Sequence, residues 1–309
     1  MKLAIAVLCF FVVSGFSYLG AQEFPTYTTN QNAELQRDEE IHAIALNGTP
    51  EELKQVLKSG YDVNKIYLCN TLLNSAIKSA GRGQNVAEHP EYAIEKIKTL
   101  IDAGADVNND PCPGKASDAL AWALTLPFQV QILEMDANKG LDEKIKTGTE
   151  YCYIPDVVSK PCKDITSEER QGIRQYLHKT FGDANKMLMP YFMDIIKLLV
   201  DKGADINKAG IHGQAPLHHA ASIPQDVTTE PVRYLVQKGA DVNARDIYGQ
   251  TPLFFAYGNG NNEVVELLIN SGANISVRNS SGVTYDKVKG SLKRDIMKDD
   301  GSIDTEGSL

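Results

Sequence analysis

The sequence lacks an excess of basic residues: 31 Lys and Arg stand against 40 Asp and Glu, a formal net charge of −9. General nucleic-acid binders and proteins that dock on anionic membranes need a basic surface, so the charge argues against both classes. The start of the chain also lacks a run long enough to cross a bilayer. Its apolar stretch, residues 3–13, is shorter than the roughly 20 residues that a spanning helix requires.

Signatures of common enzymes are missing as well. The sequence has no GxSxG, no phosphate-binding loop, no HExxH and no dinucleotide fingerprint. No serine or cysteine has an evident base and orienting acid beside it, and no CxxC provides a zinc site. We therefore expect no catalytic residue, no metal and no cofactor.

The first 21 residues have the layout of a secretory signal peptide: Lys2, the apolar stretch, then small residues up to Ala21. We expect cleavage after Ala21 and export, to the periplasm if the source is bacterial, which the short signal with one lysine favours, or to the exterior. Four cysteines then remain, and an even number in an exported protein predicts two disulfides. Free buried thiols or zinc ligands are the alternatives. The four are Cys69, Cys112, Cys152 and Cys162.

A short glycine turn recurs five times along the chain. The copies read SGYDVN (59–64), AGADVN (103–108), KGADIN (202–207), KGADVN (238–243) and SGANIS (271–276). The interval from Gly203 to Gly239 is 36 residues and that from Gly239 to Gly272 is 33. Apolar residues precede each glycine by seven, four and three positions, which places them on one helical face. A period near 33 with this pattern predicts a helical solenoid.

Two segments carry a family resemblance. GQAPLHHAA (213–221) and GQTPLFFA (249–256), with Pro216 and Pro252, resemble the ankyrin repeat. The resemblance implies an all-α solenoid of about six units over residues 38–290. It also implies that His42 and His218 tie neighbouring turns together, and that His219 faces the concave side instead of binding a metal with His218. The glycines that end the second helices would adopt positive φ. These are Gly104, Gly203, Gly239 and Gly272.

The spacing departs from a plain array in the middle of the chain. Gly104 and Gly203 are 99 residues apart, and the excess, about residues 127–189, falls between the two helices of the third repeat. Its segments 128–146 and 167–188 are predicted to be helical, so the insertion is partly helical. Insertions on one face commonly mark a binding face, although long loops are also tolerated as decoration. A leader, residues 22–37, and an acidic flexible tail, residues 291–309, complete the expected layout.

Repeat register favours one pairing of the cysteines among the three possible. Cys69 and Cys112 stand near the entrances of successive repeats, where turns lie side by side, and Cys152 with Cys162 would close a local loop. Ankyrin arrays bind other proteins, and exposed aromatic side chains on a rigid frame carry much of such binding. Trp122 is either such a residue or a core anchor. The other candidates are Tyr67, His212, His219, Tyr248 and Phe255 at the tips and concave side, and Tyr151 and Tyr153 on the insertion.

The expected function is therefore binding of another protein by a chain that is monomeric when free. The chain resembles exported ankyrin proteins that shield their own cell from peptidoglycan-cutting peptidases, which implies an inhibitor of, or protector against, an exported enzyme. Three alternatives stay open. The first is a secreted effector that binds host proteins, the second is a structural scaffold, and the third is an enzyme formed by the insertion.

Overall fold

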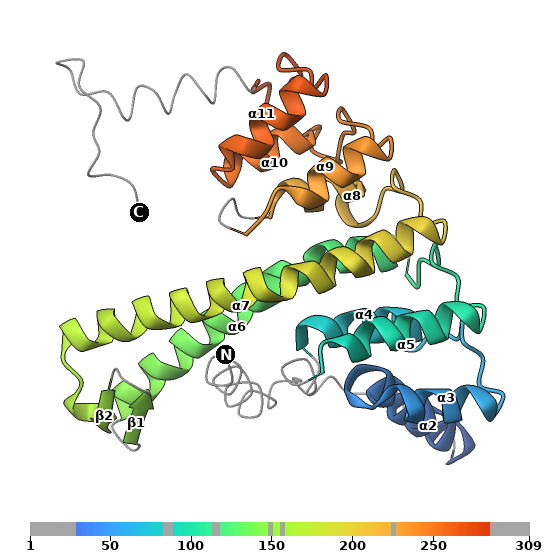
Figure 1. Cartoon of the computed structure of the whole chain (residues 1–309), viewed down its shortest axis with the longest axis horizontal. Helices are drawn as coiled ribbons and strands as arrows, with labels where there is room; N and C mark the ends of the chain where they lie inside the picture. Colours follow the sequence, from blue (N-terminus) through green and yellow to red (C-terminus); the bar gives the residue numbers. More distant parts are fainter. Residues whose placement is uncertain are drawn as a thin grey trace. The chain divides into compact units, whose positions relative to one another are not determined.

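The computed structural model describes residues 29–82, 89–112, 118–147, 151–154, 158–223 and 227–284. The predicted signal peptide and acidic tail lie outside these ranges. The chain divides into two compact units, Met1–Ala204 and Asp205–Leu309, which we describe separately. The expected all-α array of helix pairs is confirmed (Figure 1).

In its described residues, the first unit has four short to medium helices followed by two long ones. The helix α2 begins inside the segment expected to be a leader, and its Glu34 forms an ion pair with Lys65 (2.7 Å). Glu34 therefore belongs to the folded unit. The elements are α2 (Thr29–Asn47), α3 (Pro50–Lys58), α4 (Leu72–Arg82), α5 (Glu91–Asp102), α6 (Ala119–Thr147), β1 (Tyr151–Ile154), β2 (Val158–Pro161), the 3-10 turn η1 (Cys162–Asp164) and α7 (Ser167–Asp201).

The described residues of the second unit form two further helix pairs. Pro216 and Pro252 begin the first helix of each pair, where the missing N–H would have no intrahelical partner. The turn glycines have positive φ, as predicted; Gly203 and Gly239 are at 92° and 94°. The elements are the 3-10 turn η2 (Ile211–Gly213), α8 (Pro216–Ala221), α9 (Glu230–Gln237), α10 (Pro252–Gly258) and α11 (Asn262–Asn270).

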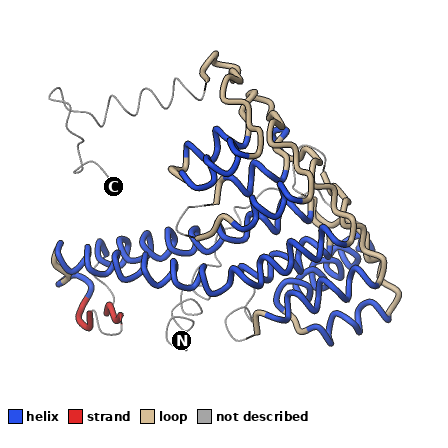
Figure 2. Tube along the Cα trace, turned by 45° about the horizontal axis from the view of Figure 1, so that its top comes forward, coloured by secondary structure: helices blue, strands red, loops and turns tan. Residues whose placement is uncertain are grey.

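The insertion is an extension of the helices of the third repeat. The 29-residue α6 and the 35-residue α7 run through the expected boundaries and form an antiparallel helical hairpin, closed by β1 and β2 at its far end (Figure 2). Pro127 and Pro190 lie inside these helices. Asn185 Nδ2 donates to Pro127 O at 3.1 Å, and Arg174 pairs with Asp142 at 2.7 Å. Sequence spacing suggested inserted helices, whereas the structure shows continuous ones.

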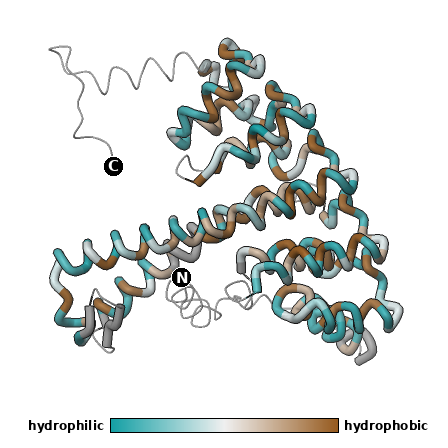
Figure 3. The backbone as a smooth tube through the Cα atoms, in the orientation of Figure 1, coloured by the Kyte–Doolittle hydropathy of each residue, from teal (hydrophilic) through white to brown (hydrophobic). Residues whose placement is uncertain are grey.

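Packing along the hairpin follows a regular apolar stripe. The buried side chains of the inserted part of α7 recur every three or four residues, which keeps them on one face. Figure 3 shows the hydrophobic positions alternating with hydrophilic ones along the hairpin, as expected for two helices that bury one face each. The stripe comprises Ile173, Leu177, Phe181, Ala184 and Leu188.

In four of the five glycine turns, one asparagine joins its repeat to the next. Asn64 Nδ2 donates to Gly104 O at 3.0 Å, and Asn64 Oδ1 accepts the Asp106 N–H at 2.8 Å. The aspartate two positions before each asparagine accepts its backbone N–H and so closes the turn. This explains the Asp-x-Asn part of the recurring turn. The equivalent side-chain bonds run from Asn108 to Gly203 (2.8 Å), Asn207 to Gly239 (3.4 Å) and Asn243 to Gly272 (3.1 Å).

Replacing Asn64 with alanine should remove both bonds of its junction. We expect the free energy of unfolding to fall by about 1–2 kcal/mol, because each exposed hydrogen bond contributes around 1 kcal/mol. Urea denaturation followed by the fluorescence of Trp122, the only tryptophan of the chain, measures the change. Asn64→Asp keeps an oxygen that can accept the Asp106 N–H, so this variant should lose less stability than the alanine variant. Equal stability of the alanine variant and the parent would show that this series of asparagine bonds, the asparagine ladder, does not stabilise the repeats.

Candidate protein-binding surface

The turns that precede α8 and α10 in the second unit, called tips below, present exposed side chains next to each other. Ile247 and Tyr248 are 63% and 53% exposed, and the Tyr248 ring lies 6.3 Å from that of His212. Ile247 N–H donates to His212 O at 2.9 Å, so the two tips are hydrogen-bonded. His212 has φ of 58°, and a side chain at Gly213 would press on Ile247 at 3.2 Å. The backbone therefore holds this apolar and aromatic group in place.

The two adjacent histidines have different surroundings. His218 is fully buried; its Nδ1 accepts the Ala215 N–H at 3.0 Å and its Nε2 lies 3.1 Å from Gln250 O in the following turn. This is the bridge between turns that the sequence predicted. Phe255 is partly buried, with its ring edge-on to His218 at 5.2 Å. His219 is partly buried, and its Nε2 has no hydrogen-bond partner among the described residues.

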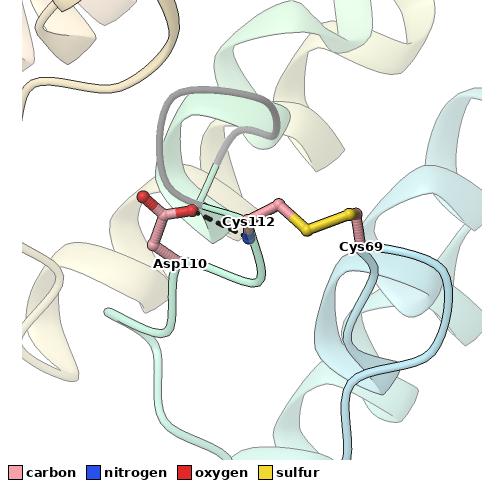
Figure 4. The surroundings of a disulfide bond; sticks show 3 residues. All are labelled: Cys69, Asp110 and Cys112. Carbon is pink, nitrogen blue, oxygen red and sulfur yellow. Dashed lines mark hydrogen bonds between the residues drawn. A yellow bond between two sulfur atoms is a disulfide. The ribbon is translucent and has the colours of Figure 1, made fainter.

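In the first unit, a disulfide holds an unusual turn. Cys69 and Cys112 are bonded, with Cα atoms 5.2 Å apart, which confirms this predicted pair (Figure 4). The Cys112 N–H donates to Asp110 Oδ1 at 3.2 Å. Leu68 and Cys69 have φ of 46° and 58°, a backbone region that residues other than glycine seldom adopt. Leu68, 71% exposed, is thereby displayed at the tip.

Tyr67 lies in this turn and forms hydrogen bonds with Asn70 through both backbone groups at 2.9 Å. Its ring is partly buried and contacts His42, with centroids 5.3 Å apart. His42 Nδ1 lies 2.9 Å from Ser75 Oγ in the next repeat. Burial lowers the pKa of His42 to about 4; Asp38 opposes this shift and Lys78 assists it.

The side chain of Trp122 lies between α4 and α6, and its role in partner binding stays a prediction. Its side chain is partly buried on α6, and Lys78 Nζ of α4 stands 4.1 Å from the ring centroid, a cation–π contact. These two residues, with Leu126 and Gln129, line a pocket of about 130 Å³. The ring therefore anchors α4 against α6 and also lines a pocket.

The candidates on the insertion fall largely outside the described side chains. Tyr151 and Tyr153 lie on β1, opposite Pro161 and Ser159 in the strand register, but their side chains are not among those described. The same holds for Cys152, so its pairing stays a prediction. Cys162 is buried and disulfide-bonded.

Several surface residues escaped the sequence reasoning. The exposed Leu68 and Ile247 were not expected, because only aromatic residues and histidines were considered at the tips. Lys78 and Gln129 come together only through the packing of α4 on α6. The asparagine ladder was visible as a recurring letter, but its partners could be identified only in three dimensions.

Among the described residues, no group of three or more His, Cys, Asp or Glu could hold a metal ion. No helix in the described ranges has the length and apolar character needed to cross a membrane. A family model described as ankyrin repeats, in three copies, matches residues 189–279. No curated protein matches the chain.

Proposed function

We propose that the chain is an exported binding module, because residues 189–279 match a family model of ankyrin repeats and such repeats indicate a protein–protein interaction module. Its partner in this proposal is an exported enzyme, which it inhibits or against which it protects the cell. Two separate observations carry the binding proposal: Leu68 is exposed at a turn of the first unit, and Ile247 and Tyr248 are exposed at a turn of the second. Exposed apolar groups on a rigid frame are typical of interfaces.

The helical hairpin is the second surface that supports the proposal. It lengthens one repeat by two helical arms, and nothing in the repeat architecture requires this length. Export is supported by the signal-like first 21 residues and by the Cys69–Cys112 bond, since disulfides persist in oxidising compartments. An enzyme is the proposed partner because a protruding helical hairpin can occlude an active-site cleft.

Affinity capture from the exported proteins of the source cell tests the proposal. The intact chain is compared with a shortened-hairpin variant in which residues 131–181 are replaced by a short glycine-containing loop. The pairs Asp142–Arg174 and Pro127–Asn185 give the register of α6 against α7, so this cut removes matched lengths of both helices. We expect the intact chain to capture one enzyme and the shortened form to capture at least about tenfold less.

Two controls make the result interpretable. A double variant at the tips, Ile247→Ser with Tyr248→Ser, keeps the hairpin and tests the repeats separately. The captured enzyme is then assayed with added chain, where inhibition should saturate near one chain per enzyme molecule. Equal capture by the intact and shortened forms would assign recognition to the repeats. Capture of nothing by the intact chain, or capture without inhibition, would contradict the proposed inhibitory role.

A further inference from the structure

The pocket between α4 and α6 has a chemical character that the exposed tips lack. The described residues that line it contribute the Lys78 ammonium, the Trp122 ring, the Leu126 side chain and the Gln129 amide. Gln129 Oε1 is buried and has no hydrogen-bond partner among the described residues. The pocket thus combines a cation, an apolar wall and an amide in one small space.

Among the described residues that line the pocket, Lys78 carries the only charge, although the chain as a whole is acidic. Neither α4 nor residues 119–130 of α6 contain an acidic residue. Asp118, just before α6, is buried and its Oδ1 accepts the Ala121 N–H at 2.9 Å. An anionic group is therefore the complementary occupant.

The size of the pocket limits the occupant to one side chain. An apolar cavity of roughly 150 Å³ holds a benzene molecule, and this pocket measures about 130 Å³. A carboxylate with its one or two methylene groups fits the chemistry, because its oxygens accept from Lys78 while the methylenes contact Trp122 and Leu126.

The geometry of Lys78 is set by neighbouring polar groups. Its Nζ donates to Asn70 Oδ1 at 3.0 Å, and Asn70 Nδ2 donates to Ser75 Oγ at 2.6 Å. Asn70 follows Cys69 directly, so the disulfide-held turn also positions the pocket's cation. Gly81 of α4 lets α6 approach, since a Cβ there would lie 3.2 Å from Gln129 Cβ. The pocket is thus fixed by the fold of the first unit.

We propose that the pocket lined by Lys78, Trp122, Leu126 and Gln129 receives an acidic side chain, glutamate or aspartate, of the protein partner. This inference rests on the proposed function, because it names the chemistry by which the partner would be recognised in the first unit.

The test uses Trp122 as its own reporter, because it is the single tryptophan of the chain. The purified chain is titrated with N-acetylglutamate N-methylamide and, separately, with the corresponding glutamine compound. We expect a saturable fluorescence change for the glutamate compound with a dissociation constant on the order of 1–10 mM, as befits so few atoms. The glutamine compound should bind at least about tenfold more weakly. Equal responses to the two compounds would overturn the proposal without any substitution.

Variants then locate the effect. Lys78→Met should abolish the saturable response and lower partner capture by about tenfold, whereas Lys78→Arg should retain both within about threefold. Lys238→Met is the matched control, because it removes another lysine that stands over an aromatic ring, that of Tyr234 at 5.4 Å, in the second unit. Circular dichroism checks that each variant is folded.

The outcomes separate the two proposals. A partner captured equally well by the parent and by folded Lys78→Met would overturn the pocket proposal and leave the binding function intact. A selective response to the glutamate compound in a chain that captures no protein would contradict the binding function and support the pocket's preference for an acid.

Discussion

Replacing Cys69 and Cys112 together with alanine is expected to lower the free energy of unfolding of the first unit by about 4 kcal/mol. The bond joins residues 43 positions apart, and closing a loop of that length in the unfolded chain removes entropy of about this size. It also holds Leu68 and Cys69 in a backbone region that costs energy, so the turn should reorganise once the bond is lost.

Urea denaturation followed by Trp122 fluorescence measures this change, since Trp122 lies in the same unit. The parent treated with a reductant is an imperfect control, because the disulfide of Cys162 opens as well. The alanine pair therefore isolates the effect of one bond, and Cys69→Ser with Cys112→Ser should reproduce it. An unchanged urea midpoint would mean that the Tyr67–Asn70 hydrogen bonds alone hold the turn.

Acidification from pH 7 to pH 5 should destabilise the first unit by roughly 2 kcal/mol through His42 alone. The pKa of His42 is lowered to about 4, mainly by burial, against an ordinary value of 6.5. Between these two values the unfolded chain binds a proton that the folded chain does not bind, so stability falls as pH falls through that range. The loss is about 3 kcal/mol at pH 4 and becomes complete only below that pH.

The variant His42→Gln tests this assignment. It is expected to be less stable than the parent at pH 7, while its unfolding free energy should vary less with pH between 5 and 7.5. Glu52 and Glu169 also have lowered pKa values, Glu52 through hydrogen bonds with Thr49 and Glu169 through hydrogen bonds with Lys160 and Thr166. Their contribution to stability is lost only in stronger acid, so the measurement stops at pH 5. A pH profile identical in the parent and His42→Gln would refute the role given to His42. Burial also lowers the pKa values of His218 and His219, so the second unit should follow the same direction.

The repeats could be predicted in some detail because their signal is local. The residues seven positions before the glycines, such as Leu53 and Ile97, are fully buried as the helical spacing indicated. The prediction was less accurate for the residues three positions before the glycines, of which Ile269 is 37% exposed. That position lies at the edge of the helix face, and periodicity alone does not measure how far the neighbouring repeat extends.

The insertion and the pocket could not be predicted to the same depth. The sequence showed helical segments on either side of residue 150, but whether they join the helices of the repeat depends on how Pro127 and Pro190 are accommodated by tertiary packing. The contact of Lys78 with Trp122 depends on the approach of α4 to α6, which no pattern within either helix reveals. The tip residue Leu68 owes its exposure to the backbone conformation of its turn.

The asparagine ladder bears on the order in which the chain assembles. The side-chain bonds from Asn243 and Asn207 close segments of only 29 and 32 residues, whereas that from Asn108 to Gly203 closes 95. Closing the longer segment costs about 1 kcal/mol more in chain entropy. We expect α6 and α7 to pack against each other first, because only a short connection separates them along the chain. Their packing then shortens the distance that the chain between Asn108 and Gly203 must span. The junction of the third repeat then forms late, and a newly made chain would expose that junction to chaperones and proteases the longest.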